Sequence, residues 1–206
     1  MFTSFINWTG RTVKRLRVFP LLRFKFIYFC DSILNSHGTE WDYVLKFLPR
    51  VPKDSKTVCE VGASEGLFIY ELRSRGYKTY SLDQRPFQEK VRSDITYLIK
   101  DYLKPLPEFD NYFDYIVSIS TFEHMGMGEY GDDRRDNGTL LALKNSYRLL
   151  KDDGFLILTL PIDHYGYTVE KVKDITKELF TVRDIEVRRG MTCVVLGKRP
   201  GINPVF

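Results

Sequence analysis

The sequence predicts an α/β fold: a seven-stranded, mostly parallel sheet with helices on both faces. Three observations predict it. Short apolar runs alternate along the chain with segments of helical periodicity, which is the pattern of successive βαβ units. A glycine-rich turn follows the first of these runs, at residues 62–66. Later runs end in acidic or small polar residues, which parallel strands would bring together at one edge of a sheet.

The first strand, turn and helix are the most informative unit. Val58–Val61 has the composition of a buried strand, and Leu67–Arg73 has helical character. The glycines between them allow the backbone to approach a ligand, although a purely structural turn is the alternative. A dinucleotide-binding loop has the spacing G-x-G-x-x-G, but Ser64 and Leu67 occupy its second and third glycine positions. The unit is therefore typical of a nucleotide-binding α/β sheet without the dinucleotide fingerprint.

The remaining elements follow in order. A helix capped by Thr39 precedes the first strand and turns Trp41, Val44, Leu45 and Leu48 to the core. The other expected strands are Tyr77–Leu82, Thr96–Lys100, Tyr115–Ile119, Phe155–Leu160, Thr181–Arg188 and Thr192–Gly197. Apolar residues at helical spacing predict helices over residues 140–150 and 169–179, and residues 151–154 have the composition of a turn.

Two of these strands end in carboxylates. Asp83 follows the second strand, about twenty residues after the glycine turn, where a carboxylate can accept two hydrogen bonds from a ribose diol. A solvated turn aspartate is the alternative for Asp83 considered by itself. Asp101 and Tyr102 follow the third strand. The fourth strand leads into the sequence S-T-F-E-H at residues 120–124.

Four motifs in this order resemble those of class I S-adenosylmethionine-dependent methyltransferases. They are E-x-G-x-x-x-G at 60–66, Asp83, the pair at 101–102, and F-D-Y-I-V-S with its following E-H at 113–124. The resemblance covers residues 40–199 and implies methyl transfer with S-adenosylmethionine as cofactor. It also implies a Rossmann-like methyltransferase fold in which the strands expected at 181–188 and 192–197 form a C-terminal antiparallel hairpin. Within the family, E-H-M-G-M-G-E-Y-G-D at 123–132 resembles an uncharacterised subgroup often met in glycan-assembly settings.

The resemblance also implies roles for individual residues. Glu60 would orient the loop and meet the methionine ammonium, Asp83 the ribose, and Asp101 the adenine. Ser120 would lie beside the methionine moiety, and Arg85 would flank the ribose site. The full cofactor-binding set that it implies is Glu60, Gly62, Ala63, Ser64, Gly66, Asp83, Gln84, Asp101, Tyr102 and Ser120.

His124 is the candidate general base, because it follows the fourth strand on the acceptor side and an imidazole exchanges protons near neutral pH. A histidine bonded to the backbone is the alternative, and His164 and Tyr165 are further candidates to face the acceptor. The glycine-containing stretch 126–138 could be an acceptor lid or a solvated loop. No metal site is assigned, although Mg²⁺ at Asp132, Asp133, Asp136 and Asn137 is an alternative.

The basic residues are concentrated in an N-terminal arm. Six basic residues precede the first acidic one, Asp31, and the rest of the chain carries 25 basic and 27 acidic residues. We therefore divide the chain into a basic, amphipathic arm at 1–38 and a methyltransferase domain at 39–206. Residues 1–30 could pack on the domain, lie on an anionic membrane surface, or contact nucleic acid, which is the less favoured alternative.

Three scattered cysteines, Cys30, Cys59 and Cys193, predict a reducing, cytoplasmic location, peripheral to the membrane if the arm binds lipid. No stretch approaches the roughly 20 apolar residues needed to span a bilayer.

The acceptor is inferred partly by elimination. Residues 120–123 carry neither the D/N-P-P-Y/F motif of amino-methylating DNA enzymes nor the Pro-Cys pair of cytosine C5 enzymes. Only Glu123 loosely fits the double-glutamate loop of protein arginine methyltransferases. We expect O-methylation of a sugar, glycan or small-molecule hydroxyl. An RNA methyltransferase that uses the arm, a non-catalytic scaffold, and a related reaction such as aminopropyl transfer are the alternatives. The sequence predicts no oligomeric state.

Overall fold

The structure is a computed structural model, and it describes residues 37–63, 67–87, 92–131, 133–202 and 204. Residues 1–36 of the N-terminal arm lie outside the described residues, as do Ser64 and Gly66 of the glycine turn and Asp132. The elements are α3 (His37–Lys46), β1 (Thr57–Val61), α4 (Phe68–Ser74), β2 (Lys78–Asp83), β3 (Ile95–Ile99), η1 (Pro107–Phe109), β4 (Phe113–Ile119), η2 (Phe122–His124), α5 (Gly138–Leu149), β5 (Leu150–Pro161), α6 (Val169–Thr176), β6 (Phe180–Arg188) and β7 (Met191–Lys198).

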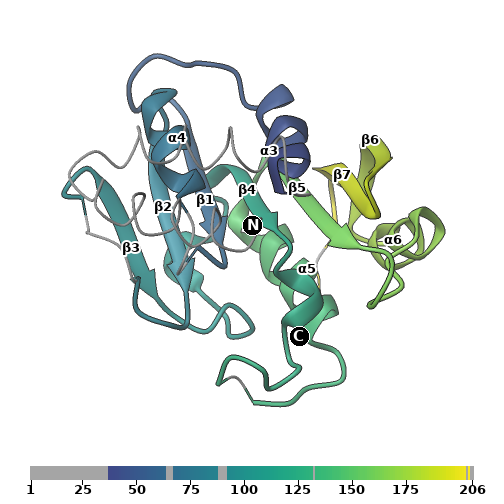
Figure 1. Ribbon diagram of the computed structural model, residues 1–206. Coiled ribbons are helices and arrows are strands. Elements are labelled where there is room, and N and C mark those ends of the chain that lie inside the picture. The colour runs from purple at the N-terminus through teal and green to yellow at the C-terminus, as the bar shows by residue number, and fades with distance from the viewer. Residues whose placement is uncertain (1–36, 64–66, 88–91, 132, 203, 205–206) are drawn as a thin grey trace, which may run out of the picture.

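A single seven-stranded sheet with the order β3-β2-β1-β4-β5-β7-β6 organises the fold (Figure 1). The first five strands in this order are parallel, and β7 pairs antiparallel with both β5 and β6. The predicted fold is therefore confirmed, including the C-terminal antiparallel hairpin. Because the strand order reverses between β1 and β4, the loops that leave these two strands lie next to each other at the carboxyl edge of the sheet.

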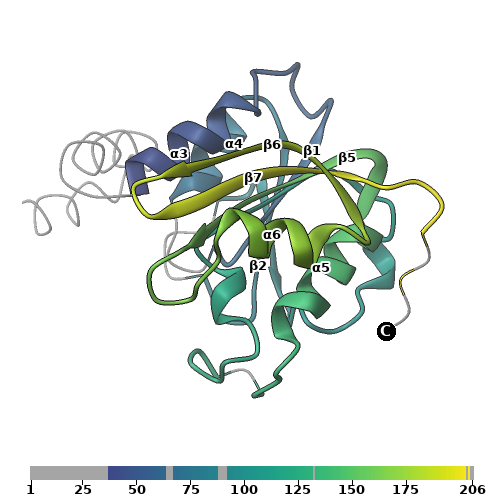
Figure 2. The same ribbon diagram turned by 90° about the vertical axis from the view of Figure 1, so that its right-hand side faces the viewer.

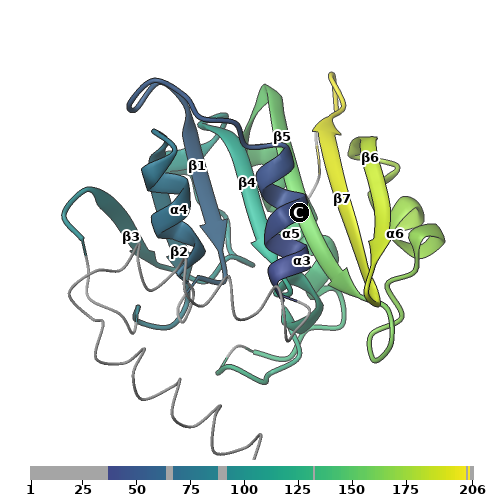
Figure 3. The same ribbon diagram turned by 45° about the horizontal axis from the view of Figure 1, so that its top comes forward.

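Helices cover both faces of the sheet. Helices α3 and α4 lie on one face, and α5 and α6 lie on the other (Figures 2 and 3). Each face has its own apolar core, and side chains along a strand alternate between the two. In β1, Val58 packs in the core beneath α3 and α4, whereas Cys59 packs in the core beneath α5. The sheet is thus buried on both sides, as its continuous apolar strands require.

A buried carboxylate fastens the opposite, amino edge of the sheet. Asp114 of β4 accepts hydrogen bonds from the backbone N–H and the hydroxyl of Thr57, both at 2.8 Å. It also accepts from Lys56 at 3.0 Å and Lys151 at 2.9 Å. Burial would raise the pKa of this carboxyl group, but the hydrogen bonds outweigh it and hold the pKa well below its usual range. One side chain therefore joins the starts of β1, β4 and β5.

Two sequence expectations were wrong in detail. Residues 151–154 are part of strand β5, where an irregularity in the pairing accommodates them: Phe113 pairs with Leu150, but Tyr115 pairs with Phe155. Thr39 is not the cap of α3, because the helix already begins at His37 and Thr39 lies in its first turn. None of the helices formed by the described residues is long and apolar enough to cross a membrane.

Candidate functional site

The end of β1 supplies a buried carboxyl group and a turn without space for a side chain. Glu60 is 5% exposed, and its Oε2 has no hydrogen-bond partner in the described part of the chain. Burial raises the pKa of Glu60 to about 8, partly offset by a hydrogen bond from the backbone of Ile69. Gly62 has φ +85°, and a Cβ there would collide with the side chain of Thr121. Ala63 is buried beside it. The turn can therefore hold a compact cationic group next to bare backbone.

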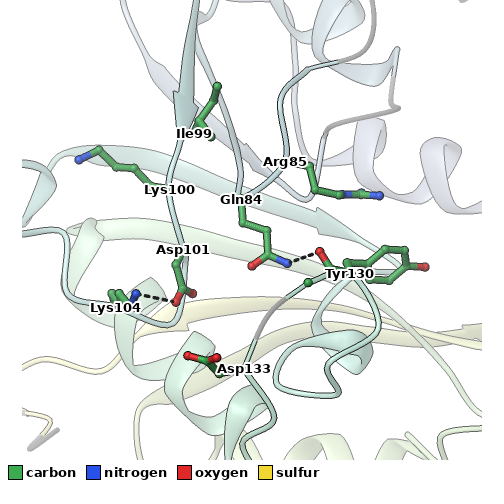
Figure 4. Close-up of a pocket in the computed structure, with 9 residues that line it drawn as sticks. Gln84, Arg85, Ile99, Lys100, Asp101, Lys104, Tyr130 and Asp133 are labelled. Carbon is green, nitrogen blue, oxygen red and sulfur yellow. Dashed lines mark hydrogen bonds and ion pairs between the residues drawn. The ribbon is translucent and has the colours of Figure 1, made fainter.

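The end of β2 presents a second carboxylate. Asp83 accepts a hydrogen bond from the backbone N–H of Arg85 at 2.8 Å, and the Arg85 guanidinium lies 3.4 Å from the same oxygen. The neighbouring Gln84 donates from its side-chain amide to the backbone carbonyl of Tyr130 at 3.0 Å (Figure 4). The strand end is thus held in place from both its own turn and the segment after β4.

A hollow of about 330 Å³ opens between the ends of β2 and β3 (Figure 4). Asp101 lines it and accepts from the backbone N–H of Leu103 at 2.8 Å, while Lys104 lies 3.6 Å from its other oxygen. Tyr102 is instead turned into the core, where its hydroxyl meets Ser146 of α5 at 2.9 Å. The residues that line the hollow are Gln84, Arg85, Ile99, Lys100, Asp101, Lys104, Tyr130, Gly131 and Asp133.

Ser120 follows β4 with a positive φ of 44°, and its hydroxyl is engaged by helix α3. It donates to Oε1 of Glu40 at 2.7 Å, and Thr159 of β5 donates to the same oxygen at 2.6 Å. Glu40 is buried, which is unusual for a glutamate unless it is hydrogen-bonded. The first turn of α3 therefore lies directly against the carboxyl edge of the sheet.

His124 ends the short helix η2 and is surrounded by polar and aromatic groups. Its Nδ1 lies 2.6 Å from Oε2 of Glu129 and 3.1 Å from the hydroxyl of Tyr165. Its Nε2 forms no hydrogen bond within the described residues, and the nearest acidic oxygen there, Glu123 Oε1, is 3.9 Å away. Glu123 is buried with Oε2 unpartnered among the described residues, and burial raises its pKa to about 8.

The structure brings several of the predicted residues together. Gln84 and Asp101 line the hollow, and Asp83 precedes Gln84 at the end of β2. Tyr165 contacts His124, whereas His164 is exposed. No group of three or more His, Cys, Asp or Glu side chains in the described ranges is arranged to hold a metal ion. Sequence reasoning missed Glu40, Glu129 and Tyr130. Glu40 carried a signal, because it shares one face of α3 with the buried Val44 at i+4.

A family model described as a methyltransferase domain matches residues 35–181. The chain belongs to this methyltransferase family. It is a class I enzyme that uses S-adenosylmethionine as its cofactor. The site fits such a group: the unpartnered oxygen of Glu60 suits an ammonium, Gly62 leaves no side chain in the way, and the carboxylate of Asp83 suits a diol.

Solved structures share the fold of this methyltransferase. A protein from Pyrococcus horikoshii is 15% identical with a TM-score of 0.63, over 80% of this chain and 91% of that one. A TehB-like S-adenosylmethionine-dependent methyltransferase from Corynebacterium glutamicum is 17% identical with a TM-score of 0.59, over 82% and 91%.

A third similar structure holds ligands. The 1,6-didemethyltoxoflavin-N1-methyltransferase from Burkholderia thailandensis, with 1,6-didemethyltoxoflavin and S-adenosylhomocysteine bound, is 14% identical with a TM-score of 0.56, over 76% of this chain and 74% of that one. No functionally curated protein matches the chain in sequence.

Proposed function

We propose that this methyltransferase methylates a hydroxyl group of a sugar, glycan or other small molecule, with His124 as the general base. The observation that carries the proposal is the state of His124: Nδ1 is held by Glu129 while Nε2 forms no hydrogen bond in the described part of the chain. An alcohol must lose its proton as it is methylated, and an imidazole nitrogen with an available lone pair can accept that proton.

The cofactor residues are part of the same proposal. When bound, S-adenosylmethionine supplies an activated methyl group on a sulfonium with a good leaving group. Glu60 would pair with the ammonium of its methionine part, and Asp83 would accept hydrogen bonds from the ribose hydroxyls. Asp101 and the hollow beside it would take the adenine end. Ser64 and Gly66, which lie outside the described residues, stay assigned to the turn that passes the cofactor.

The chain's own contribution to the chemistry is positioning and proton removal. The loops after β1 and β4 touch at Gly62 and Thr121, which places the proposed cofactor turn and the proposed base on adjacent strand ends. Holding an acceptor hydroxyl in line for displacement accounts for much of the rate of such reactions. His124 would receive the proton of that hydroxyl at Nε2.

Two measurements test this function. Calorimetric titration with S-adenosylhomocysteine should show binding that Asp83→Ala weakens at least about tenfold, since the loss of hydrogen bonds to a charged group costs about 1.5–3 kcal/mol. Asp174, which is exposed on α6, provides the control, and Asp174→Ala should bind like wild type.

Transfer of labelled methyl groups to a panel of sugars and nucleotide sugars should fall about 10²- to 10⁴-fold in His124→Asn. Failure to bind S-adenosylhomocysteine would reject the proposal.

For the N-terminal arm we propose contact with an anionic membrane surface, supported by its six basic residues and interspersed aromatics. The full chain should co-sediment with phosphatidylserine vesicles, and a chain lacking residues 1–30 should not.

RNA is the alternative methyl acceptor and binding partner, and the positive charge of the same arm supports it. Binding to RNA that weakens steeply with salt, without binding to vesicles, would favour it instead.

A further inference from the structure

We propose that Glu129 is a positioning residue that sets the tautomer and orientation of His124, and that its segment, Met125–Gly131, is anchored on the end of β2. The proposal rests on the assignment of His124 as the base. Glu129 follows His124 by five residues, and the family resemblance assigns it no role. Its role emerges only from the contacts of the folded segment.

Glu129 determines which nitrogen of the His124 imidazole carries the hydrogen. Glu129 Oε2 lies 2.6 Å from Nδ1 of His124, within the range of a short charge-assisted hydrogen bond. An ionised carboxylate can only accept, so Nδ1 must carry the hydrogen and Nε2 must carry the lone pair. In an unconstrained imidazole the opposite tautomer, with hydrogen on Nε2, predominates. Glu129 therefore prepares the nitrogen that the proposed reaction uses.

The contacts of His124 also fix the orientation of its ring. Two tyrosine rings contact the imidazole edge to face, Tyr130 at 5.3 Å and Tyr165 at 5.1 Å between centroids. The hydroxyl of Tyr165 also approaches Nδ1, at 3.1 Å. With Nδ1 bound and both rings in place, the imidazole has little freedom to turn. Nε2 is then kept on the side of Glu123, away from Glu129.

The segment Met125–Gly131 is held in place at both ends. Tyr130, the neighbour of Glu129, accepts a hydrogen bond at its carbonyl from Gln84, and the Arg85 guanidinium lies 4.6 Å from its ring centroid (Figure 4). At the other end of the segment, the carbonyl of Gly126 accepts from the backbone N–H of Arg135 at 2.8 Å. The segment is thus fastened beside Asp83, so the proposed ribose site and the proposed base are mechanically connected.

The test is the tautomer itself, read by long-range ¹H–¹⁵N correlation on protein labelled with ¹⁵N-histidine at about pH 8.5. The chain has three histidines, and His37→Gln and His164→Gln variants assign the His124 signals. In wild type, His124 should be mainly the Nδ1–H form. In Glu129→Ala it should move to the ordinary mixture dominated by Nε2–H. Glu129→Asp, which keeps an acceptor-only group, should restore most of the Nδ1–H signal.

The control and the contrary results are equally direct. Glu178→Ala, an exposed glutamate beyond α6, should leave the His124 signals unchanged. Gln84→Ala should shift His124 part of the way toward the Glu129→Ala spectrum, because it releases Tyr130. A wild-type His124 in the Nε2–H form, or a Glu129→Ala spectrum identical to wild type, would overturn the proposal. Since this readout needs no methyl acceptor, its failure is separable from a failure of His124→Asn to impair methyl transfer.

Discussion

Oε1 of Glu40 lies 2.7 Å from the hydroxyl of Ser120, which joins helix α3 to the loop that leaves β4. A helix that precedes the first strand thus contributes to the carboxyl edge of the sheet, where the candidate site lies. Ser120 stays assigned to the methionine part of the cofactor, and its hydroxyl donates to Glu40. This contact holds α3 against the segment that leads from β4 to the proposed base, His124.

Removal of this carboxylate should destabilise the fold. In Glu40→Ala the hydroxyls of Ser120 and Thr159 lose their common acceptor, which should lower the free energy of unfolding by about 2–4 kcal/mol. Urea denaturation followed by circular dichroism measures the change. Glu40→Gln keeps an oxygen acceptor and should lose less than half as much. Equal losses in the two variants would mean that packing, not hydrogen bonding, makes Glu40 important.

Gly62 can be tested against a glycine with the same backbone conformation. Gly62 and Gly131 have φ values of +85° and +86°, but a Cβ at 62 would strike Thr121 whereas a Cβ at 131 meets nothing within 4 Å. Gly131→Ala should cost only the left-handed strain, about 1–2 kcal/mol. Gly62→Ala should cost about 1–3 kcal/mol more, from overpacking. Thermal denaturation of both variants separates the two effects, and equal melting temperatures would contradict the collision.

The pH dependence of stability follows from two buried carboxyl groups. Burial raises the pKa values of Glu60 and Glu123 to about 8, above the value near 4.5 expected in the unfolded chain. The folded state therefore holds more protons than the unfolded state between these values. Stability from both groups is fully present below about pH 4.5 and is lost as the pH rises through about 8.

In the cofactor-free protein, each group should steepen the loss of stability by up to about 1.4 kcal/mol per pH unit within this window. Glu60→Gln and Glu123→Gln should each flatten the dependence measured by urea denaturation from pH 5.5 to 8.5. The exposed Glu178→Gln should keep the wild-type slope. An unchanged slope in either buried variant would show that its carboxyl group is already ionised in the folded protein.

Asp114 should behave in the opposite way. Its pKa is held below the usual range by hydrogen bonds, so its contribution is present above about pH 4 and is lost as the pH falls further. Asp114→Ala should lower the free energy of unfolding by about 2–4 kcal/mol at neutral pH. The gap between variant and wild type should narrow below pH 4. A gap that stays constant on acidification would argue against the hydrogen-bonded carboxylate.

Most of the fold could be predicted from the sequence, because its signals are local. Runs of β-rich apolar residues mark the strands, and β4 and β7 were found to within two residues at each end. The positive φ of Gly76, 102°, is the kind of backbone that a helix-ending glycine adopts, and α4 ends just before it. The acidic residues at the ends of β2 and β3 also lie where the parallel order places them.

The contacts that assemble the site could not be predicted in the same way. Glu40 meets Thr159 across 119 residues, and Gln84 meets Tyr130 across 46. The position of Glu40 on the apolar face of its helix indicates burial, but no pattern in the sequence names the partner of either residue. The Glu129–His124 pair is closer in sequence, but its contact depends on the backbone turns at Gly126 and Gly128, which have φ values of +78° and +76°.

Among the described residues, each of the two apolar cores contains one thiol, so the two cores can be observed separately. Cys59 lies in the core beneath α5, and Cys193 lies in the core beneath α3 and α4. Both are free and buried, so a thiol reagent can reach each one only when its own side of the sheet opens. With Cys30 replaced by serine, the two labelling rates would therefore report which helical layer detaches first. The two thiols are therefore separate probes of opening, one on each side of the sheet.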